Sequence, residues 1–471
     1  MNQKPLSSLL LLLSTLLIVW LFSFWAALSS AVSVWSSSET FKHCFFILPL
    51  VLYLFYERKQ ELRIVNFAPN YWLGFALLFT FALNLAGELL GINLITHASA
   101  YLALVSIVWL CLGNDFIKKF WFPMLFLGFC VPFGEELVPI LQDVTAYLTV
   151  ELVKLIGIPI YRDGLYLYVP NGTFLVAEAC AGIRFLIASF ALGTLFAYLN
   201  YRTRWKFFAF IVASLLVPII ANGIRAFGIV AIGYSTDMEH AVGADHLVYG
   251  WFFFAFVLLL LFGIGQIGQE NTRIEVSSQQ PDGNVTRTSL KQGVVVVLLA
   301  LAIPLYAVSI NTQHVPPNPE HLRDKISDLG RLQERNFDWQ PMLVSPLQTW
   351  SGNIDSLPIY FAYYHTDNNE SELVSGLNRY FNIDIYTRKS FSRVSTDKGL
   401  INRVELVDVS GKQISLFYWF SIDNKRTAGS LQTKVNQALS KLNADRGEGY
   451  FVAVEAQDLS QAELLLAPIG L

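Results

Sequence analysis

The chain has 471 residues, of which 54% are hydrophobic and only 15% are charged, and its mean hydropathy is +0.46. A water-soluble fold cannot hide that much apolar surface, so the composition excludes an ordinary soluble protein and predicts that most of the chain lies in a lipid bilayer. The net charge of −3 and the lack of a long basic stretch exclude nucleic acid as a partner.

The charged residues divide the chain into two parts. Residues 1–310 hold 34 charged side chains, whereas the shorter segment 311–471 holds 35. The second density is close to that of soluble globular domains. We therefore expect a multi-pass membrane domain over residues 1–270, a cytoplasmic linker over 271–291, a further span over 292–310 and a soluble domain over 311–471.

Nine stretches are apolar enough to cross the bilayer as helices, although two of them are short. They cover residues 7–27, 41–55, 71–90, 97–113, 119–134, 181–200, 206–226, 247–264 and 292–310. The first could be a signal peptide, but its long apolar run favours a retained anchor. The predicted fold class is a polytopic α-helical membrane protein, with eight spans and a ninth linking span, followed by a soluble α+β domain.

Lysine and arginine residues mark the cytoplasmic side of a membrane protein. They lie before the first span and after the second, fourth, sixth and eighth spans, with Lys42, Lys154 and Arg162 as exceptions. This alternation predicts a cytoplasmic N-terminus. It places residues 135–180, residues 227–246 and the C-terminal domain on the outer face.

Local patterns predict structure outside the spans. Residues 138–158 are expected to form a helix with Pro139 in its first turn, and residues 164–174 a β-hairpin or extended pair that leads to Cys180. In the soluble domain, strands are expected at 358–365, 382–388, 403–409, 414–421 and 450–455, and helices at 371–381 and 430–443.

Ionisable side chains at the ends of spans are costly to place, so they are candidates for function. Four of them lie at the predicted outer ends of three consecutive spans. Cys180 and Arg184 begin the sixth span, Arg225 ends the seventh, and His246 begins the eighth. Consecutive helices joined by short loops are usually neighbours, so these groups are expected to converge.

Cys180 is the candidate nucleophile. A cysteine in the first turn of a helix and beside a cation is more readily a thiolate, which is the reactive form. The alternative is a small buried hydrophobe, which fits Cys44, Cys111 and Cys130. The cysteines form no CxxC pair and no metal-ligand spacing with histidine, so neither a metal nor a cofactor is expected.

Two arginines could assist the thiol. Arg225 closes the motif that begins at Asn222, and it could be a permanent cation for a thiolate or an oxyanion, or simply snorkel to the membrane surface. Arg184 follows Cys180 by four residues and would share its helix face. It could hold the thiolate or a substrate carboxylate, or pair with Glu178.

His246 is the candidate general acid and base, because an imidazole beside a thiolate can protonate a leaving amine. The alternatives are an interfacial histidine satisfied by water, or a role for His240 in the same loop. The sequence does not contain the motifs of other enzyme classes, since the chain has no P-loop, no G-x-G-x-x-G, no H-E-x-x-H and no G-x-S-x-G motif.

Three motifs carry a family resemblance: AEACAGIR at 177–184, NGIR at 222–225, and His246 at the head of a span. Together they resemble the exosortases, bacterial multi-pass membrane cysteine transpeptidases, in order and spacing. The resemblance implies that Cys180, Arg225 and His246 are catalytic, with Arg184, Glu178 and Asn222 in supporting positions. Ala181 stands where many members have serine. Residues 372–379 resemble an exopolysaccharide-locus domain often associated with exosortases.

The resemblance also implies a substrate. Exosortases are thought to cleave exported proteins at a C-terminal sorting signal, which consists of a Pro-containing motif, a transmembrane helix and a basic tail. They then transfer the acyl group to an amine or hydroxyl acceptor. The expected location is the bacterial inner membrane, with the site and the C-terminal domain in the periplasm. The alternatives are a non-enzymatic exopolysaccharide export or assembly protein, and an intramembrane protease that only hydrolyses.

Overall fold

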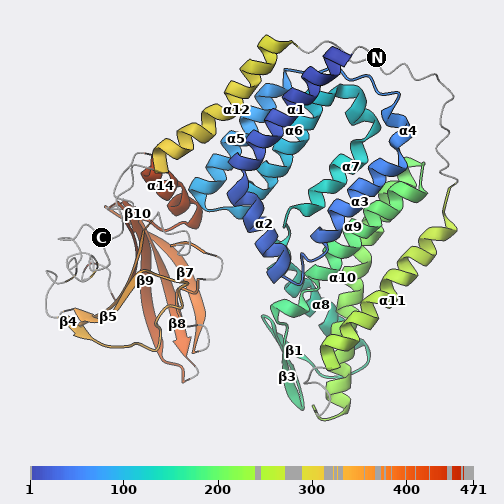
Figure 1. The fold of residues 1–471 in the computed structure, drawn as a ribbon. Helices are drawn as coiled ribbons and strands as arrows, with labels where there is room; N and C mark the ends of the chain where they lie inside the picture. The colour runs from blue at the N-terminus through green and yellow to red at the C-terminus, as the bar shows by residue number, and fades with distance from the viewer. Residues whose placement is uncertain are drawn as a thin grey trace. The chain divides into compact units, whose positions relative to one another are not determined.

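The computed structural model describes residues 3–238, 245–270 and 289–311, and most of residues 332–457 with short gaps. The side chains of residues 245–249 and 308–311 lie outside this description. The chain forms two compact units, Met1–Thr80 with His97–Leu298 and Phe81–Thr96 with Leu299–Leu471 (Figure 1). Most of the predicted linker, residues 271–288, lies outside the described residues.

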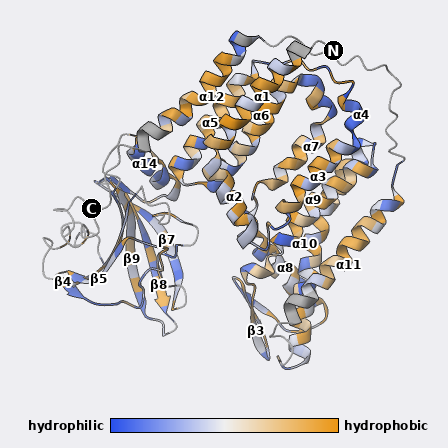
Figure 2. Cartoon of the chain, viewed as in Figure 1, coloured by the Kyte–Doolittle hydropathy of each residue, from blue (hydrophilic) through white to orange (hydrophobic). Residues whose placement is uncertain are grey.

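The membrane part of the chain is helical. Its helices are α1 (Gln3–Ser23), α2 (Trp25–Ser37), α3 (Cys44–Glu57), α4 (Lys59–Leu62), α5 (Leu73–Leu90), α6 (Asn93–Lys119), α7 (Trp121–Phe126), α8 (Val138–Leu155), α9 (Ile183–Asn200), α10 (Arg204–Ser235), α11 (Asp245–Ile267) and α12 (Leu290–Asn311). Short 3₁₀ turns are η1 (Leu127–Cys130), η2 (Glu135–Leu137) and η3 (Glu178–Cys180). Figure 2 shows that the long helices are predominantly hydrophobic.

The chain is a multi-pass membrane protein. Among the described residues, six helices are long and apolar enough to cross a bilayer, or up to seven if a pair bent by 66° counts as one span. The stretch predicted as the second span is α3, which has only 14 residues. At about 1.5 Å per residue, such a helix is shorter than the roughly 30 Å hydrocarbon core. The number nine stays a prediction.

The stretch predicted as the fifth span, 119–134, is not one helix. It contains α7 and η1, then an extended segment that ends at Gly134, and α8 follows after the 66° bend. Gly134 has a left-handed backbone (φ +103°), and Pro132 cannot donate a helical hydrogen bond. The apolar composition of residues 119–134 gives no sign of this break. The two helical segments on either side of the bend form a broken span or a re-entrant loop.

Small residues let α8, α9 and α10 approach one another closely. A Cβ on Gly193 of α9 would lie 2.4 Å from the Ser214 Cβ of α10, and one on Gly223 of α10 would lie 2.8 Å from the Leu148 Cβ of α8. Such contacts are typical of helix packing in membranes, where dispersion contacts replace the hydrophobic effect. This packing determines which face of α10 is directed towards α8.

Glu270, just beyond α11, joins that helix to the start of α10. Its carboxylate forms an ion pair with Lys206 at 2.7 Å and accepts hydrogen bonds from the backbone of Arg202 and Thr203. The hydrogen bonds from Lys206 and Thr203 lower the pKa of Glu270 to about 2. The end of α11 is therefore held at the N-terminus of α10, away from the candidate site residues at the other ends of these helices.

A three-stranded antiparallel sheet follows α8, in agreement with the predicted helix and hairpin. Its strands are β1 (Tyr161–Asp163), β2 (Tyr166–Val169) and β3 (Gly172–Leu175). Asn171, in the turn between β2 and β3, donates to the Tyr234 carbonyl of α10 at 2.7 Å, and Gln142 of α8 donates to the Val176 carbonyl at 2.8 Å. These bonds fix the path of the chain into η3.

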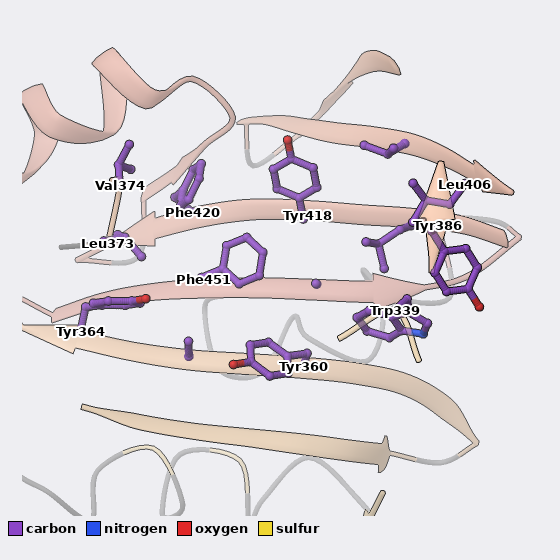
Figure 3. Packing of buried hydrophobic residues seen from close by; sticks show 14 of the residues in the cluster. Trp339, Tyr360, Tyr364, Leu373, Val374, Tyr386, Leu406, Tyr418, Phe420 and Phe451 are labelled. Atoms are coloured by element: carbon purple, nitrogen blue, oxygen red, sulfur yellow. The ribbon is translucent and has the colours of Figure 1, made fainter. Parts of the chain in front are cut away.

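The C-terminal region contains one antiparallel sheet in the order β4-β5-β6-β11-β9-β8-β7, with β10 paired to β9. The strands are β4 (Leu332–Glu334), β5 (Gln348–Ile354), β6 (Leu357–His365), β7 (Tyr386–Thr396), β8 (Gly399–Asp408), β9 (Gln413–Ile422), β10 (Lys425–Thr427) and β11 (Glu448–Glu455). The central strands bury side chains on both faces, and Figure 3 shows one of these clusters around Phe451, Tyr418 and Tyr360.

Most elements predicted for this region are confirmed. Strands β6, β8, β9 and β11 and the helix α14 (Ser430–Leu442) lie where they were expected, while β7 begins late and β5 was missed. The predicted helix at 371–381 is wrong for its described residues. Asn378 accepts a hydrogen bond from the Val344 backbone at 2.9 Å, and Arg379 forms a β-bridge with Met342, which together hold this segment in a non-helical path.

Candidate active site

Cys180 ends η3, and α9 begins only three residues later, at Ile183. The prediction that Cys180 lies in the first turn of the helix is therefore wrong. The break arises at Gly182, which has a left-handed backbone (φ +75°) and is the N-cap of α9. The thiol is half-buried and packs against the apolar cluster that includes Val150, Val176 and Phe227.

Asn222 of α10 holds the backbone of the cysteine. Its side-chain amide donates to the Cys180 carbonyl at 2.7 Å and to the Thr145 hydroxyl of α8 at 3.0 Å, and the residue is only 2% exposed. A Cβ on Gly182 would lie 2.7 Å from the Asn222 Cγ. Glycine is required at 182 both for the left-handed backbone and for this close approach.

The Arg225 guanidinium lies near the Cys180 thiol and also near α11. It is close enough to Cys180 for an electrostatic interaction between the two side chains. A Cβ on Gly250 of α11 would lie 3.0 Å from Nη2, 3.2 Å from Cζ and 3.3 Å from Nε of Arg225. Because these three distances are nearly equal, the guanidinium directs its flat face, and not its edge, towards Gly250.

His246 lies in the first turn of α11, one helical turn before Gly250. Positions four apart share a helix face. The backbone therefore places His246 on the face of α11 that carries Gly250 and contacts Arg225. Its side chain lies outside the described part, and the rival His240 falls within residues 239–244, which are outside the described residues altogether.

Arg184 is the second residue of α9, so the expectation that it shares a helix face with Cys180 is wrong. Its guanidinium lies 4.6 Å from the ring centre of Phe185 and 5.8 Å from that of Trp251 on α11. Its Nε is buried without a hydrogen-bond partner in the described part of the chain. It is also near enough to repel Arg225 electrostatically. The two cations therefore lie near each other beside α11.

Glu178 does not form the ion pair with Arg184 that was considered, as judged from the described residues. It is exposed at the start of η3 and lies near Glu135. Within the described part of the chain, no three His, Cys, Asp or Glu side chains cluster as metal ligands.

Sequence reasoning missed three residues at this site: Gly182, Thr145 and Gly250. Gly182 carried a weak signal, since glycine between a cysteine and an apolar run can mark a helix start. Gly250 could have been noticed four residues after His246. Thr145 had no signal, because its role depends on the contact between α8 and α10.

These features define a multi-pass membrane protein in which a thiol lies near the guanidinium of Arg225, and that guanidinium lies near Arg184. Residues 35–263, just under half of the chain, match the family model of the transmembrane exosortases. This region of the chain is therefore similar to the transmembrane exosortases. Searches of curated proteins and of solved structures found no match.

Proposed function

We propose that this protein is a membrane cysteine transpeptidase that cleaves C-terminal sorting signals of exported proteins and transfers them to an acceptor. The observation that carries the proposal is the position of the Cys180 thiol within electrostatic reach of the Arg225 guanidinium, where η3, α10 and α11 meet. A fixed cation beside a half-buried thiol can stabilise the oxyanion that forms when the sulfur attacks a carbonyl.

In the proposed reaction, the Cys180 thiolate attacks the scissile carbonyl carbon and the oxyanion that forms is stabilised by Arg225. His246 donates a proton to the leaving amine as the C–N bond breaks, which leaves a thioester on Cys180. An acceptor amine or hydroxyl then loses its proton to His246 and attacks the thioester carbonyl. The C–S bond breaks, and the thiolate is restored.

The supporting residues have separate roles in this proposal. Asn222 is a positioning residue, because it holds the Cys180 carbonyl rather than the thiol. The Arg184 guanidinium has a buried Nε without a partner in the described chain, and it is a candidate to bind an acidic group of the sorting motif. Glu178 is exposed at the start of η3, two residues before the cysteine, and is a candidate to contact a bound peptide.

The proposed topology is nine spans with a cytoplasmic N-terminus in a bacterial inner membrane. The cysteine, the two arginines and the soluble domain are then periplasmic. A sorting signal with one membrane helix and a basic tail would present its cleavage site at the same membrane surface. The domain limits proposed are residues 1–270, 271–291, 292–310 and 311–471.

The test is the mass of the product. The full chain is expressed with a tagged exported protein that ends in a candidate sorting tail, and the product is recovered intact. Loss of the tail with an added mass at the new C-terminus supports transfer. Addition of water alone indicates a hydrolase, and an uncut substrate favours a non-enzymatic export or assembly protein.

Replacing Gly182 with alanine should reduce processing by at least about tenfold, because the left-handed backbone costs about 1–2 kcal/mol and the new Cβ displaces Asn222. Gly157→Ala is the matched control, since Gly157 also has a left-handed backbone (φ +80°) but has no atom within 4 Å of the added Cβ. Processing is compared at equal membrane levels. Equal losses in both variants would contradict the role of the Asn222 contact.

Gly250→Val should also reduce processing, by about tenfold or more, because the side chain occupies the space of the Arg225 guanidinium. The control is Gly263→Val in the same helix, where an added Cβ meets nothing within 4 Å. Both variants carry the same cost of a β-branched residue in a helix. If Gly250→Val retains the activity of Gly263→Val, Arg225 does not need its position against α11.

A further inference from the structure

The helix α14 exposes its large apolar side chains and buries Thr433, Ala438 and Ser440. Leu431, Val435, Leu439 and Leu442 are 71%, 40%, 49% and 36% exposed, and their spacing places them in one stripe along the helix. A helix on the surface of a soluble domain normally has the opposite arrangement. The stripe is thus a contiguous apolar surface that water solvates poorly.

The buried side of α14 is held by hydroxyl groups. The Thr433 hydroxyl hydrogen-bonds to the Thr427 hydroxyl at 2.6 Å, and the Ser440 hydroxyl donates to the Asp423 carboxylate. Thr433 is fully buried and Ser440 is 3% exposed. These bonds fix the rotation of the helix on the sheet, so the apolar stripe cannot turn inwards without breaking them.

The helix α14 contacts the connection between two candidate membrane spans, α5 and α6. The Lys434 ammonium donates to the Gly91 carbonyl at 3.4 Å, and Lys441 interacts electrostatically with Glu88. Gly91 and Ile92 are the whole connection between α5 and α6, both of which are long and apolar enough to span the bilayer. A two-residue connection cannot project far from the membrane surface. The contact is internal to one compact unit, which contains residues 81–96 and 299–471.

The charge of α14 suits a phospholipid surface. Its only charged residues are Lys434 and Lys441, and it contains no acidic residue. Both lysines lie on the same flank of the apolar stripe, where ammonium groups can reach lipid phosphates while the leucines enter the acyl region.

We propose that α14 is an in-plane membrane helix, with Leu431, Val435, Leu439 and Leu442 inserted at the boundary of the lipid headgroups and acyl chains. This contact anchors the C-terminal sheet to the membrane surface beside the connection of α5 and α6. The inference rests on the helix and its neighbours, and it is independent of the proposed transpeptidase activity.

The test places the photoreactive residue benzoylphenylalanine at Val435, and separately at Leu439, in the full chain expressed in bacterial cells. Irradiated protein is purified and its intact mass is measured. The matched control carries the same residue at exposed Lys412, beside the far end of β9 from α14. The ten residues of β9 separate these ends by about 33 Å.

A mass gain of one phospholipid at positions 435 and 439, with none at 412, supports the proposal. A crosslink at unchanged mass would show that another part of this chain covers the stripe, and an adduct to a second polypeptide would show a protein partner. Either result, or no crosslink, overturns the proposal. As a second measurement, Leu439→Glu should lower the lipid adduct at position 435 by about tenfold, whereas Asn436→Glu, outside the stripe, should not.

Discussion

Cys180→Ala is expected to abolish removal of a sorting tail while the protein remains in the membrane at its normal level. Removing a nucleophile eliminates the covalent route, so the rate should fall by about 10³-fold or more. The measurement is the ratio of cut to uncut tagged substrate in cells that express each form at matched levels.

Cys130→Ala is the control for this experiment, because Cys130 is also a half-buried free thiol. Its thiol lies within reach of the Cys44 carbonyl and packs beside α3, away from the Arg225 guanidinium. It should retain processing. Equal processing by Cys180→Ala and the unmodified chain would exclude the thiol mechanism and favour the export or assembly function.

Arg225→Lys is expected to lose most activity although it retains the positive charge. The Arg225 guanidinium directs its flat face towards Gly250 of α11 and interacts electrostatically with Cys180. An ammonium group is a compact point charge and cannot reproduce a planar fork of donors. We expect a loss of about 10²–10³-fold, as for removal of one oxyanion donor.

The matched variant is Arg204→Lys, an exposed position at the start of the same helix. It should process substrate normally, and both proteins should unfold at similar temperatures in detergent. If Arg225→Lys retains activity and Arg225→Ala loses it, only the charge at this position matters, and the proposed geometry of oxyanion binding is wrong.

The candidate residues could be found without the structure because membranes restrict where ionisable groups can lie. Cys180, Arg184, Arg225 and His246 were noticed as polar groups at the ends of apolar runs, and counting basic residues placed them on one side. Counting charges along the sequence did not show which of these side chains lie near one another. The rotation of a helix about its own axis depends on packing, and here contacts such as Gly223 with Leu148 set the rotation of α10.

The sequence also did not show where the helix after Cys180 begins. The apolar run after Cys180 appeared continuous, so the cysteine was assigned to the helix itself. The left-handed backbone at Gly182 makes α9 begin at Ile183. A glycine permits this conformation, but its presence in the sequence does not show that the conformation is adopted. The close approach of Asn222 to Gly182 is a tertiary contact that favours it. A glycine with a left-handed backbone, Gly134, also lies at the break inside the predicted fifth span.

In the C-terminal region, local alternation identified strands β6, β8, β9 and β11 because their residues are strongly apolar or β-branched. Their order in one sheet depends on pairings between distant residues, such as Phe451 with Phe420 and Ala362, which no local pattern contains. The apolar stripe of α14 is visible in the sequence, but a helix with such a stripe normally turns it towards the core.

The sequence by itself indicated a membrane protein with a C-terminal region of different composition, and it identified a thiol, two arginines and a histidine as candidates, because composition and hydropathy can be read residue by residue. Only the tertiary structure decided that Arg225 lies near both Cys180 and Gly250, and that α14 directs its leucines outwards. Those arrangements arise from close packing between segments far apart in the chain, where a single hydrogen bond or a missing Cβ determines which side chains meet.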